Sequence, residues 1–243
     1  MKREKFLDEK IPMVEIFNSI SGEGITSGFL TTFVRVYGCN LRCSYCDTKY
    51  SYDGEYILMT PSDILKEVNK FNCRRIIVTG GEPLEEDKLK RYIPIYLTQN
   101  GYEVRIETNG SVKLYNEEEI LEFTGSKERK NLFYTLDIKC PSSNMDKFNI
   151  FEENFKRLIL GDEIKFVVGN VKDLDYSMQV VEKYKEYFKG VTLNFSSVFS
   201  KVEPSQIVDY LKAKNKFFME NNLDVRVNIQ LHKIIWDKDK RGV

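Results

Sequence analysis

Short apolar runs rich in β-branched residues alternate with amphipathic stretches along this chain, and the alternation constrains its fold more than any other feature. Seven runs have the composition of buried strands, at 29–38, 74–80, 102–110, 132–139, 162–170, 190–198 and 223–231. Helical periodicity occupies much of the sequence between them, at 60–71, 84–99, 116–124, 173–188 and 204–221. Strands that alternate with helices across short loops predict a parallel sheet with crossover helices.

The number of expected strands fits either an open doubly wound sheet or a curved, incomplete (β/α) barrel. No G-x-G-x-x-G motif follows the first of them, which argues against a dinucleotide-binding sheet. The 243 residues barely reach the length of an eight-unit barrel, and no linker or repeat divides them, so we expect one domain over 1–243. In both architectures the chemistry lies where strands run into loops at their C-terminal ends.

The charge balance and the cysteine usage narrow the class of protein. Lys plus Arg and Asp plus Glu both total 37, so no global basic field attracts nucleic acid. The segment "MKREKFLDEKIPM" lacks the apolar core of a signal peptide, and no segment approaches the roughly 20 apolar residues of a membrane span. Five irregularly spaced cysteines do not form a secreted disulfide framework. We therefore expect a cytoplasmic protein with neither nucleic acid nor membrane as partner.

Three of the five cysteines lie within eight positions, directly after the 29–38 strand, at Cys39, Cys43 and Cys46. Packing alone does not explain three thiols on a polar loop. Structural zinc would need a fourth ligand, but Cys73 and Cys140 stand alone, and His232 is the one histidine of the chain. We interpret Cys73 and Cys140 as structural thiols. Three thiolates can instead bind a [4Fe–4S] cluster and leave one iron open to a substrate or cofactor.

The spacing C-x3-C-x2-C, with Tyr45 before the last cysteine, resembles the signature of the radical S-adenosylmethionine enzymes. "TGGEP" (79–83), after the next strand, resembles their Gly-Gly-Glu-Pro segment. The resemblance implies α/β architecture of the incomplete (β/α)6-type TIM barrel, a [4Fe–4S] cluster on the three cysteines, and S-adenosyl-L-methionine on the open iron. It also implies cofactor contacts from Tyr45, Gly80, Gly81 and Glu82. Glycines let backbone approach a ligand closely, and a carboxylate complements the methionine ammonium group.

Over most of its length the chain is similar to the short 7-carboxy-7-deazaguanine synthases of the queuosine pathway. The similarity rests on "SISGEG" (19–24), "FVRVYGCNLRCSYCDT" (33–48), "VTGGEP" (78–83), "IETNG" (106–110), "LDIKCPSS" (136–143) and "QLHKIIW" (230–236). It implies a carbon–nitrogen lyase that contracts the ring of 6-carboxy-5,6,7,8-tetrahydropterin to 7-carboxy-7-deazaguanine with loss of ammonia. S-adenosylmethionine would act catalytically, and Mg²⁺ would be required.

The same resemblance implies which residues touch the substrate: Ser21, Gly22, Glu23, Arg35, Thr79 and His232. Glu23 would accept hydrogen bonds from ring N–H groups. Arg35 is a charge inside the apolar run "FVRV" and would bind the substrate carboxylate bidentately. The family often has Gln where Ser21 stands, so one substrate hydrogen bond is expected to be missing or water-mediated here.

Other residues are assigned by the resemblance to the cofactors. Thr48 would give Mg²⁺ a hard oxygen ligand, and Asn109, Lys139 and Ser142 would line the ribose and carboxylate of S-adenosylmethionine. The cluster loop (residues 38–48) and the C-terminal tail (residues 230–243) would enclose the site, the tail closing it. A flavodoxin- or ferredoxin-type electron donor and a homodimer are the further partners implied.

Two other hypotheses remain at this point. A glycyl-radical activating enzyme shares the cysteine spacing but docks a large protein partner, whereas "SGEG", Arg35 and "QLHK" favour a small carboxylated substrate. A metal-binding scaffold or redox sensor without catalysis is the alternative outside the enzymes. Formation of 5′-deoxyadenosine by the reconstituted protein would exclude the non-catalytic scaffold, because both enzymatic hypotheses require it.

Overall fold

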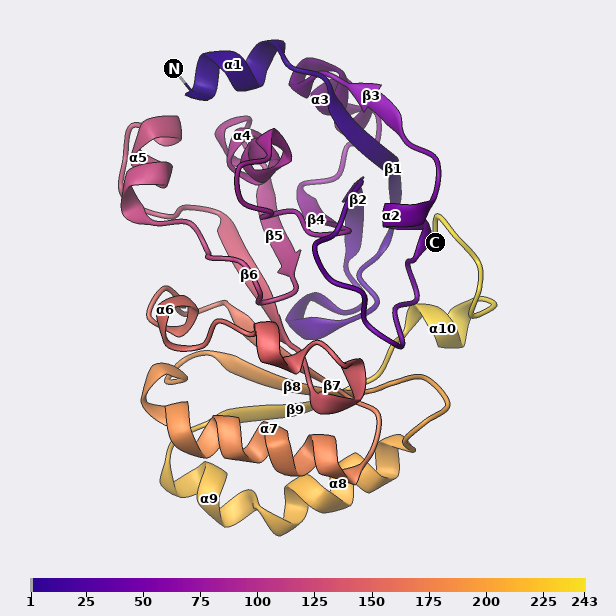
Figure 1. Ribbon diagram of the computed structural model, residues 1–243, viewed down its shortest axis with the longest axis vertical. Helices are drawn as coiled ribbons and strands as arrows, with labels where there is room; N and C mark the ends of the chain where they lie inside the picture. The colour runs from indigo at the N-terminus through magenta and orange to yellow at the C-terminus, as the bar shows by residue number, and fades with distance from the viewer. Residues whose placement is uncertain (1) are drawn as a thin grey trace.

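The computed structural model describes residues 2–243, and within them the strands form one nine-stranded sheet in the order β3-β1-β2-β4-β5-β6-β7-β8-β9 (Figure 1). The strands are β1 Ile11–Ile20, β2 Leu30–Val36, β3 Ile57–Met59, β4 Arg75–Gly80, β5 Glu103–Thr108, β6 Leu132–Ile138, β7 Glu163–Val168, β8 Thr192–Ser197 and β9 Asp224–Asn228. From β2 to β9, neighbours in this order are parallel. β1 is antiparallel to both β2 and β3.

The helices of residues 2–243 differ in location: those between parallel strands cover the convex face of the sheet (Figure 1), whereas the second and the last carry residues that line the cavity on its concave side. They are α1 Lys2–Asp8, α2 Tyr50–Asp53, α3 Pro61–Asn69, α4 Ile93–Gln99, α5 Glu117–Thr124, α6 Glu152–Phe155, α7 Val171–Tyr184, α8 Pro204–Ala213, α9 Asn215–Glu220 and α10 His232–Ile235. Within the described residues the sheet curves without closing, since β9 pairs with β8 alone. The expected incomplete α/β barrel is therefore confirmed.

All seven strands expected from the sequence are present, and two more were not expected. The sequence of β1, "IPMVEIFNSI", contains Glu15, Asn18 and Ser19, which break the apolar run that marks a buried strand. β3 has only three residues and lies at the edge of the sheet. Both are antiparallel additions to the parallel sheet, so the βα alternation did not signal them.

Two expected helices are each divided. The 84–99 stretch contains a 3₁₀ turn, Leu89–Tyr92, before α4, and Pro94 lies in the first turn of α4, where a missing N–H is tolerated. The 204–221 stretch forms α8 and α9, separated at Lys214. The helix beginning at Pro61 forms as expected, with a reciprocal capping box between Thr60 and Asp63.

The two faces of the parallel strands differ in character because successive side chains point to opposite sides. Toward the helices the strands present apolar residues such as Ile106, Leu136 and Phe166, all fully buried in the core. The alternate positions face the concave side and are polar or charged, namely Arg105, Glu107, Thr135, Asp137, Glu163 and Lys165. The register places Glu107 beside Thr135 and Asp137 beside Lys165, so these groups form one charged interior.

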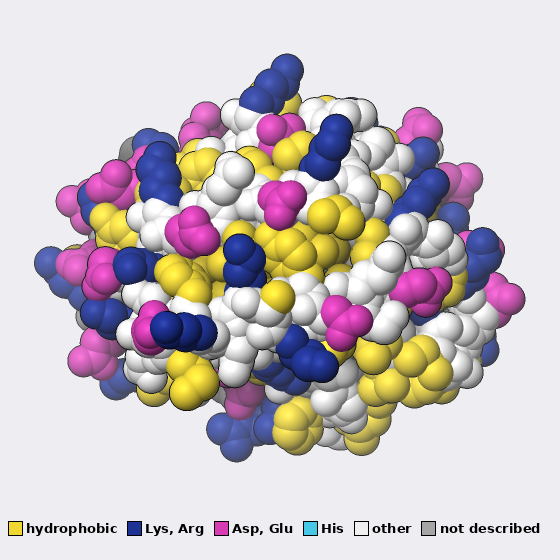
Figure 2. Space-filling view, turned by 90° about the horizontal axis from the view of Figure 1, so that it is seen from below, with side chains coloured by type: hydrophobic (Ala, Val, Ile, Leu, Met, Phe, Trp, Pro, Cys, Tyr) yellow, Lys and Arg dark blue, Asp and Glu magenta, His cyan; other side chains and the backbone are white. Residues whose placement is uncertain are grey.

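The opposite, outer surface has an ordinary mixed composition. Figure 2 views the molecule from the side of α7 to α9, where Lys and Arg side chains lie among Asp and Glu side chains and exposed apolar ones. Ion pairs on this face include Lys212 with Asp209 and Lys216 with Glu220. Within residues 2–243, no helix has the length and apolar character needed to cross a bilayer.

Candidate functional site

A cavity of about 880 Å³ occupies the concave side of the sheet. Most of the site residues expected from the sequence line it: Ser21, Gly22, Glu23, Arg35, Cys39, Cys43, Tyr45, Cys46, Thr48, Thr79, Gly80, Gly81, Asn109, Lys139 and His232. Glu82 and Ser142 do not belong to this lining. The cavity walls therefore bring together segments that are distant in the sequence, and the cavity is large enough for a nucleoside and a second small ligand.

The cluster loop is fixed mainly through its backbone. The amide of Gly38 donates to the Ser51 carbonyl (2.7 Å), and the Gly38 carbonyl accepts from the Glu82 amide (2.8 Å). The same carbonyl accepts from the ammonium group of Lys90 (2.8 Å), a side chain that is only 4% exposed. Further along, the Ser44 amide donates to the Ser143 carbonyl (3.0 Å). The loop is thus anchored on both sides of Cys39 by contacts within the protein.

The paired glycines allow this anchoring. Gly80 has φ = +129°, a conformation that L side chains rarely adopt, and a Cβ at Gly81 would lie 1.9 Å from the Gly38 carbonyl oxygen. We expected the glycines to give a ligand close access to the backbone. In the structure they let the β4 turn approach the cluster loop itself, while both still line the cavity.

Glu82 is fully buried behind this turn. Its carboxylate accepts hydrogen bonds from the amides of Leu84 (2.8 Å) and Asn109 (2.7 Å) and from the Thr108 hydroxyl (2.7 Å). Burial raises the pKa of Glu82 above its ordinary value, although these donors act in the opposite direction. In this geometry Glu82 ties the end of β4 to the end of β5.

The thiols have the surroundings of iron ligands rather than of core residues. Cys39 Sγ accepts from the Leu41 amide (3.4 Å) and the Asn109 side-chain amide (3.7 Å), and such N–H···S contacts stabilise thiolates. Ser111 fixes the Asn109 amide by donating to its Oδ1 from both N–H and O–H. Burial raises the pKa of the Cys39 and Cys43 thiols above the ordinary value.

The donor set fits a [4Fe–4S] cluster. All five cysteines are free, and Cys39, Cys43 and Cys46 line the same cavity from one loop. Among residues 2–243, no group of three or more His, Cys, Asp or Glu side chains converges on a single point as one metal ion would require. Three thiolates that bind three different irons of a cluster do not need to converge in that way.

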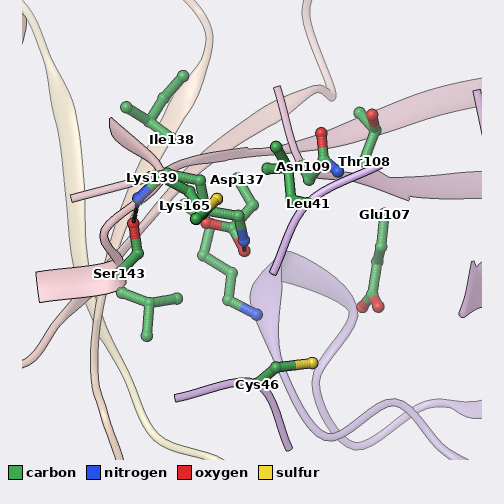
Figure 3. Close-up of polar contacts among 12 residues, drawn as sticks. Leu41, Cys46, Glu107, Thr108, Asn109, Asp137, Ile138, Lys139, Ser143 and Lys165 are labelled. Atoms are coloured by element: carbon green, nitrogen blue, oxygen red, sulfur yellow. Dashed lines mark hydrogen bonds and ion pairs between the residues drawn. The ribbon is translucent and has the colours of Figure 1, made fainter. Parts of the chain in front are cut away.

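Elsewhere in the cavity lining, the Glu23 carboxylate is held by an ion pair with Lys165 and a hydrogen bond from Gln230 Nε2 (2.6 Å). Burial alone would raise the pKa of Glu23, but Lys165 and Gln230 outweigh it and lower the pKa to about 2. The pKa of Lys165 is raised despite its burial, chiefly by Glu23. In Figure 3, Lys165, Glu107 and Cys46 extend into the same space from different elements.

Arg35 lines the cavity between these walls and is oriented by Glu15. Its Nε donates to Glu15 Oε1 (2.7 Å), which also accepts from the Tyr50 hydroxyl (3.1 Å). The guanidinium of Arg241, from the C-terminal tail, lies 3.9 Å from the centroid of the Tyr50 ring. A cation–π contact therefore joins the tail to the wall that carries Arg35.

His232 reaches the cavity at the start of α10 and packs on the segment that carries Glu23. A Cβ at Gly22 would lie 2.0 Å from His232 Nδ1, and the Leu231 amide donates to the Gly22 carbonyl (2.9 Å). Burial lowers the pKa of His232, which favours the neutral imidazole. Lys233 pairs with Asp47 of the cluster loop (3.1 Å), and residues 238–243 line the mouth of the cavity.

Besides Glu82, the expected site residue Ser142 lies outside the cavity lining, and so do Cys140 and Cys73, which were expected to be structural thiols. Ser142 donates its amide (3.0 Å) and its hydroxyl to the Asp173 carboxylate, so it fixes the start of the loop after β6. Cys140 is buried, its Sγ lies 3.5 Å from the Ser177 hydroxyl, and burial raises the pKa of its thiol. Cys73 lies against the Leu30 carbonyl (3.3 Å). The two cysteines occupy positions consistent with structural thiols.

Sequence reasoning missed several residues of the cavity wall. Glu107 accepts a hydrogen bond from Thr79 (2.7 Å), and its burial raises its pKa. Asp137 pairs with Lys139 (2.7 Å), and Lys165 pairs with Glu23. Each stands at an alternate position of an apolar strand, in "EVRIET", "LFYTLDI" and "EIKFVV". A charge at a strand position that faces the interior was the signal that could have identified them.

The comparisons with known proteins agree with this geometry. The sequence profile of the Radical SAM superfamily matches residues 33–213. The 7-carboxy-7-deazaguanine synthase of Clostridium acetobutylicum is 40% identical over 234 residues, covering 95% of this chain and 98% of that protein. The protein of the same name from Koribacter versatilis is 31% identical, with 95% and 99% covered.

A solved structure supports the fold. The crystal structure of QueE from Escherichia coli superposes with a TM-score of 0.68 at 20% identity, covering 95% of this chain and 98% of that one. At this identity the likeness concerns the fold alone. Because the profile spans most of the chain, and relatives above 30% identity align over nearly its whole length, the chain belongs to the Radical SAM superfamily and to its 7-carboxy-7-deazaguanine synthase family.

Proposed function

We propose that this enzyme is a 7-carboxy-7-deazaguanine synthase, which converts 6-carboxy-5,6,7,8-tetrahydropterin to 7-carboxy-7-deazaguanine with loss of ammonia. The observation that carries the proposal is the pairing of two recognition elements in one cavity. The three-thiol cluster loop forms one wall, and the ionised Glu23 carboxylate, held by Lys165, forms another. A ligand between them meets a cofactor on one side and an anionic hydrogen-bond acceptor on the other.

The family implies a [4Fe–4S] cluster and S-adenosylmethionine, and the residues present fit both. Cys39, Cys43 and Cys46 would hold the cluster, which together with bound S-adenosylmethionine supplies a 5′-deoxyadenosyl radical. Tyr45 and Asn109 line the cavity beside the thiols, and Gly80 and Gly81 form the adjoining wall. We propose that these four residues contact S-adenosylmethionine. Glu82 and Ser142, which are outside the lining, would act by holding Asn109 and the β6 loop in place.

For the substrate, the residues divide by charge. Arg35 would bind the 6-carboxylate with its guanidinium, and Glu15 sets its orientation through Nε. Glu23 would accept from ring N–H groups, and its pKa of about 2 keeps it an acceptor at neutral pH. Ser21, Gly22, Thr79 and His232 line the same space. A neutral His232 can either donate or accept a hydrogen bond there.

Further parts of the proposal concern the remaining partners. The Thr48 hydroxyl lies on the cavity wall beside Cys46 and would be a hard-oxygen ligand for Mg²⁺, with substrate oxygens and water completing the octahedron. Residues 230–243 would close the site and exclude water. A flavodoxin- or ferredoxin-type donor would reduce the cluster, and the protein would act as a homodimer.

The direct test is anaerobic turnover of the reconstituted enzyme. With dithionite, Mg²⁺ and S-adenosylmethionine, 6-carboxytetrahydropterin should give 7-carboxy-7-deazaguanine and ammonia, with S-adenosylmethionine used in less than stoichiometric amounts. Tetrahydropterin without the carboxylate is the matched control and should not turn over. Steady cleavage of S-adenosylmethionine without any deazapurine would overturn the proposal and favour a protein substrate, as in the activating enzymes.

A further inference from the structure

A buried carboxylate beneath the cavity has no part in the proposed chemistry. Glu163, the first residue of β7, is 1% exposed and is not part of the cavity lining. It accepts hydrogen bonds from the Thr135 hydroxyl (2.6 Å) and from Asn194 Nδ2 (2.6 Å), and it forms an ion pair with Arg105 (3.2 Å). A fourth donor, the backbone amide of Ile25 (2.9 Å), comes from the connection between β1 and β2.

Arg105 is itself fixed, which makes the position of Glu163 rigid. Its Nη1 donates to the Tyr134 carbonyl (3.1 Å) and its Nη2 to the Gly161 carbonyl (2.9 Å). Strands β5, β6 and β8 therefore all hold Glu163 from the side. A buried charge with its hydrogen bonds satisfied in this way is rigid and costly to displace.

A second buried side chain holds the next amide in the same segment. Asn228 Oδ1 accepts from the Gly24 amide (2.9 Å), while Asn228 Nδ2 donates to the Ser196 hydroxyl (2.9 Å). The second bond fixes which end of the Asn228 amide faces Gly24. We name the segment 21–26 the floor loop. Its two successive amides, of Gly24 and Ile25, thus donate to side chains of β9 and β7. In Figure 1 this connection between β1 and β2 lies near those strands.

The floor loop also packs so closely on Glu163 that no side chain fits at Gly24. Gly24 has φ = +71°, and a Cβ there would lie 2.4 Å from Glu163 Oε1. Gly28, at the end of the same connection, has φ = +88° but would place a Cβ in open space. The first glycine is required by both conformation and contact, and the second by conformation only.

The floor loop carries Glu23, whose carboxylate enters the cavity and meets Lys165. Lys165 lies two residues after Glu163 on the same face of β7, so one strand holds both the backbone and the side chain of the Glu23 segment. We infer that Glu163, assisted by Asn228, is a positioning residue that sets the Glu23 carboxylate for substrate recognition. The identity of that substrate rests on the proposed function, whereas the anchoring of the loop does not.

The test compares two glycine variants that share a backbone strain and differ in the contact. Gly24→Ala should raise KM for 6-carboxytetrahydropterin roughly tenfold or more, equivalent to about 1.4 kcal/mol, with little change in kcat. Cleavage of S-adenosylmethionine without substrate should also be unchanged. Gly28→Ala should leave KM within a factor of about three, since the strain of one positive-φ residue without a clash is small. Equal effects of the two substitutions on KM would overturn the inference.

A second arm does not depend on turnover. Hydrogen exchange at the amides of Gly24 and Ile25, measured by mass spectrometry or NMR, should be slow in the wild-type protein. It should accelerate in Glu163→Gln and Asn228→Ala. Slow exchange that persists in both variants would overturn the anchoring role. If the wild-type enzyme does not convert the pterin, the proposed function fails, while the exchange measurement still decides whether Glu163 holds the floor loop.

Discussion

The cluster loop and the floor loop both contribute to the lining of the cavity and are held in place by different means. The cluster loop rests mainly on hydrogen bonds of its own backbone, to partners that range from Ser51 to Ser143, and on the close approach of Gly81. The floor loop is held by side chains from far along the chain, among them Glu163 and Asn228. The two regions should therefore respond differently to substitution.

The largest effect is expected in the cluster loop. Replacing Cys39, Cys43 or Cys46 with Ala should abolish cleavage of S-adenosylmethionine and lower the iron content, because each thiolate would bind one iron. Iron analysis and 5′-deoxyadenosine assays measure both. Cys73→Ala, outside the cavity, is the control and should retain both. A cluster-loop variant that still cleaves S-adenosylmethionine would contradict the ligand assignment.

On the substrate side, loss should be confined to the pterin. Arg35→Ala should raise KM for 6-carboxytetrahydropterin roughly 100-fold, since loss of a buried charged contact costs about 2–5 kcal/mol. Cleavage of S-adenosylmethionine without substrate should persist. Arg35→Lys keeps the positive charge but not the planar guanidinium, so its KM should lie between those of the wild type and Arg35→Ala. If cleavage and pterin binding are lost together in Arg35→Ala, the residue supports the whole site and the contrast between the two regions fails.

The ion pair of the floor loop predicts a pH dependence. Because the folded state lowers the pKa of Glu23 to about 2 from 4.5, ionised Glu23 stabilises the fold above pH 4.5 and loses that contribution as pH falls toward 2. A shift of this size corresponds to about 3 kcal/mol. Urea unfolding of the cluster-free protein should lose more stability between pH 4.5 and 2.5 in wild type than in Glu23→Gln. Parallel curves for the two proteins would show that the pair does not act as described.

A smaller effect should come from Lys90, a buried cation that supports the cluster loop through its backbone. Lys90→Met removes the donors to the Tyr37 and Gly38 carbonyls (3.0 and 2.8 Å). Iron should be lost roughly tenfold faster during anaerobic gel filtration, since hydrogen bonds that involve a charged group contribute about 1.5–3 kcal/mol. Lys88→Met makes the same change at an exposed position. Identical iron loss in the two variants would assign no anchoring role to Lys90.

The smallest effect is expected in a region that belongs to neither loop. Thr60→Ala removes the capping box of α3, where the Thr60 hydroxyl accepts from the Asp63 amide (3.2 Å). Stability should fall by about 1 kcal/mol, with KM and S-adenosylmethionine cleavage unchanged. Thermal unfolding and the two assays measure this baseline. A change in KM here would mean that substrate affinity follows global stability, and the contrast between the loops would lose its meaning.

The same contrast explains how much the sequence could predict. The seven parallel strands and the three-thiol loop are local patterns, because burial gives strands their apolar runs and the cluster needs its cysteines close together. The sequence predicted a role for Glu23 through the resemblance of "SISGEG", but its partner Lys165 lies 142 positions away, and no local pattern joins the two. Glu15 was missed because it belongs to β1, whose polar residues hide the strand.

The expected convergence of polar residues at the strand ends accounts for only part of the cavity lining. Polar residues at the C-terminal ends of β2, β4, β5 and β6 do meet at the cavity, as parallel topology requires. The floor loop precedes β2 and so enters from the N-terminal ends of the strands, a side that general rules assign to stability. Because the sheet does not close, the floor loop can pack against β9, a strand at the edge of the sheet.

The open sheet gives the connection between β1 and β2 a role in shaping the cavity. The edges of the sheet are β3 and β9, which do not pair with each other within the described residues, whereas the short connection between β1 and β2 reaches side chains of β7 and β9. The width of the cavity consequently depends on a segment that belongs to no strand of the sheet. Insertions or deletions in residues 21–29 could alter the size of the molecule admitted while every strand pairing stays intact.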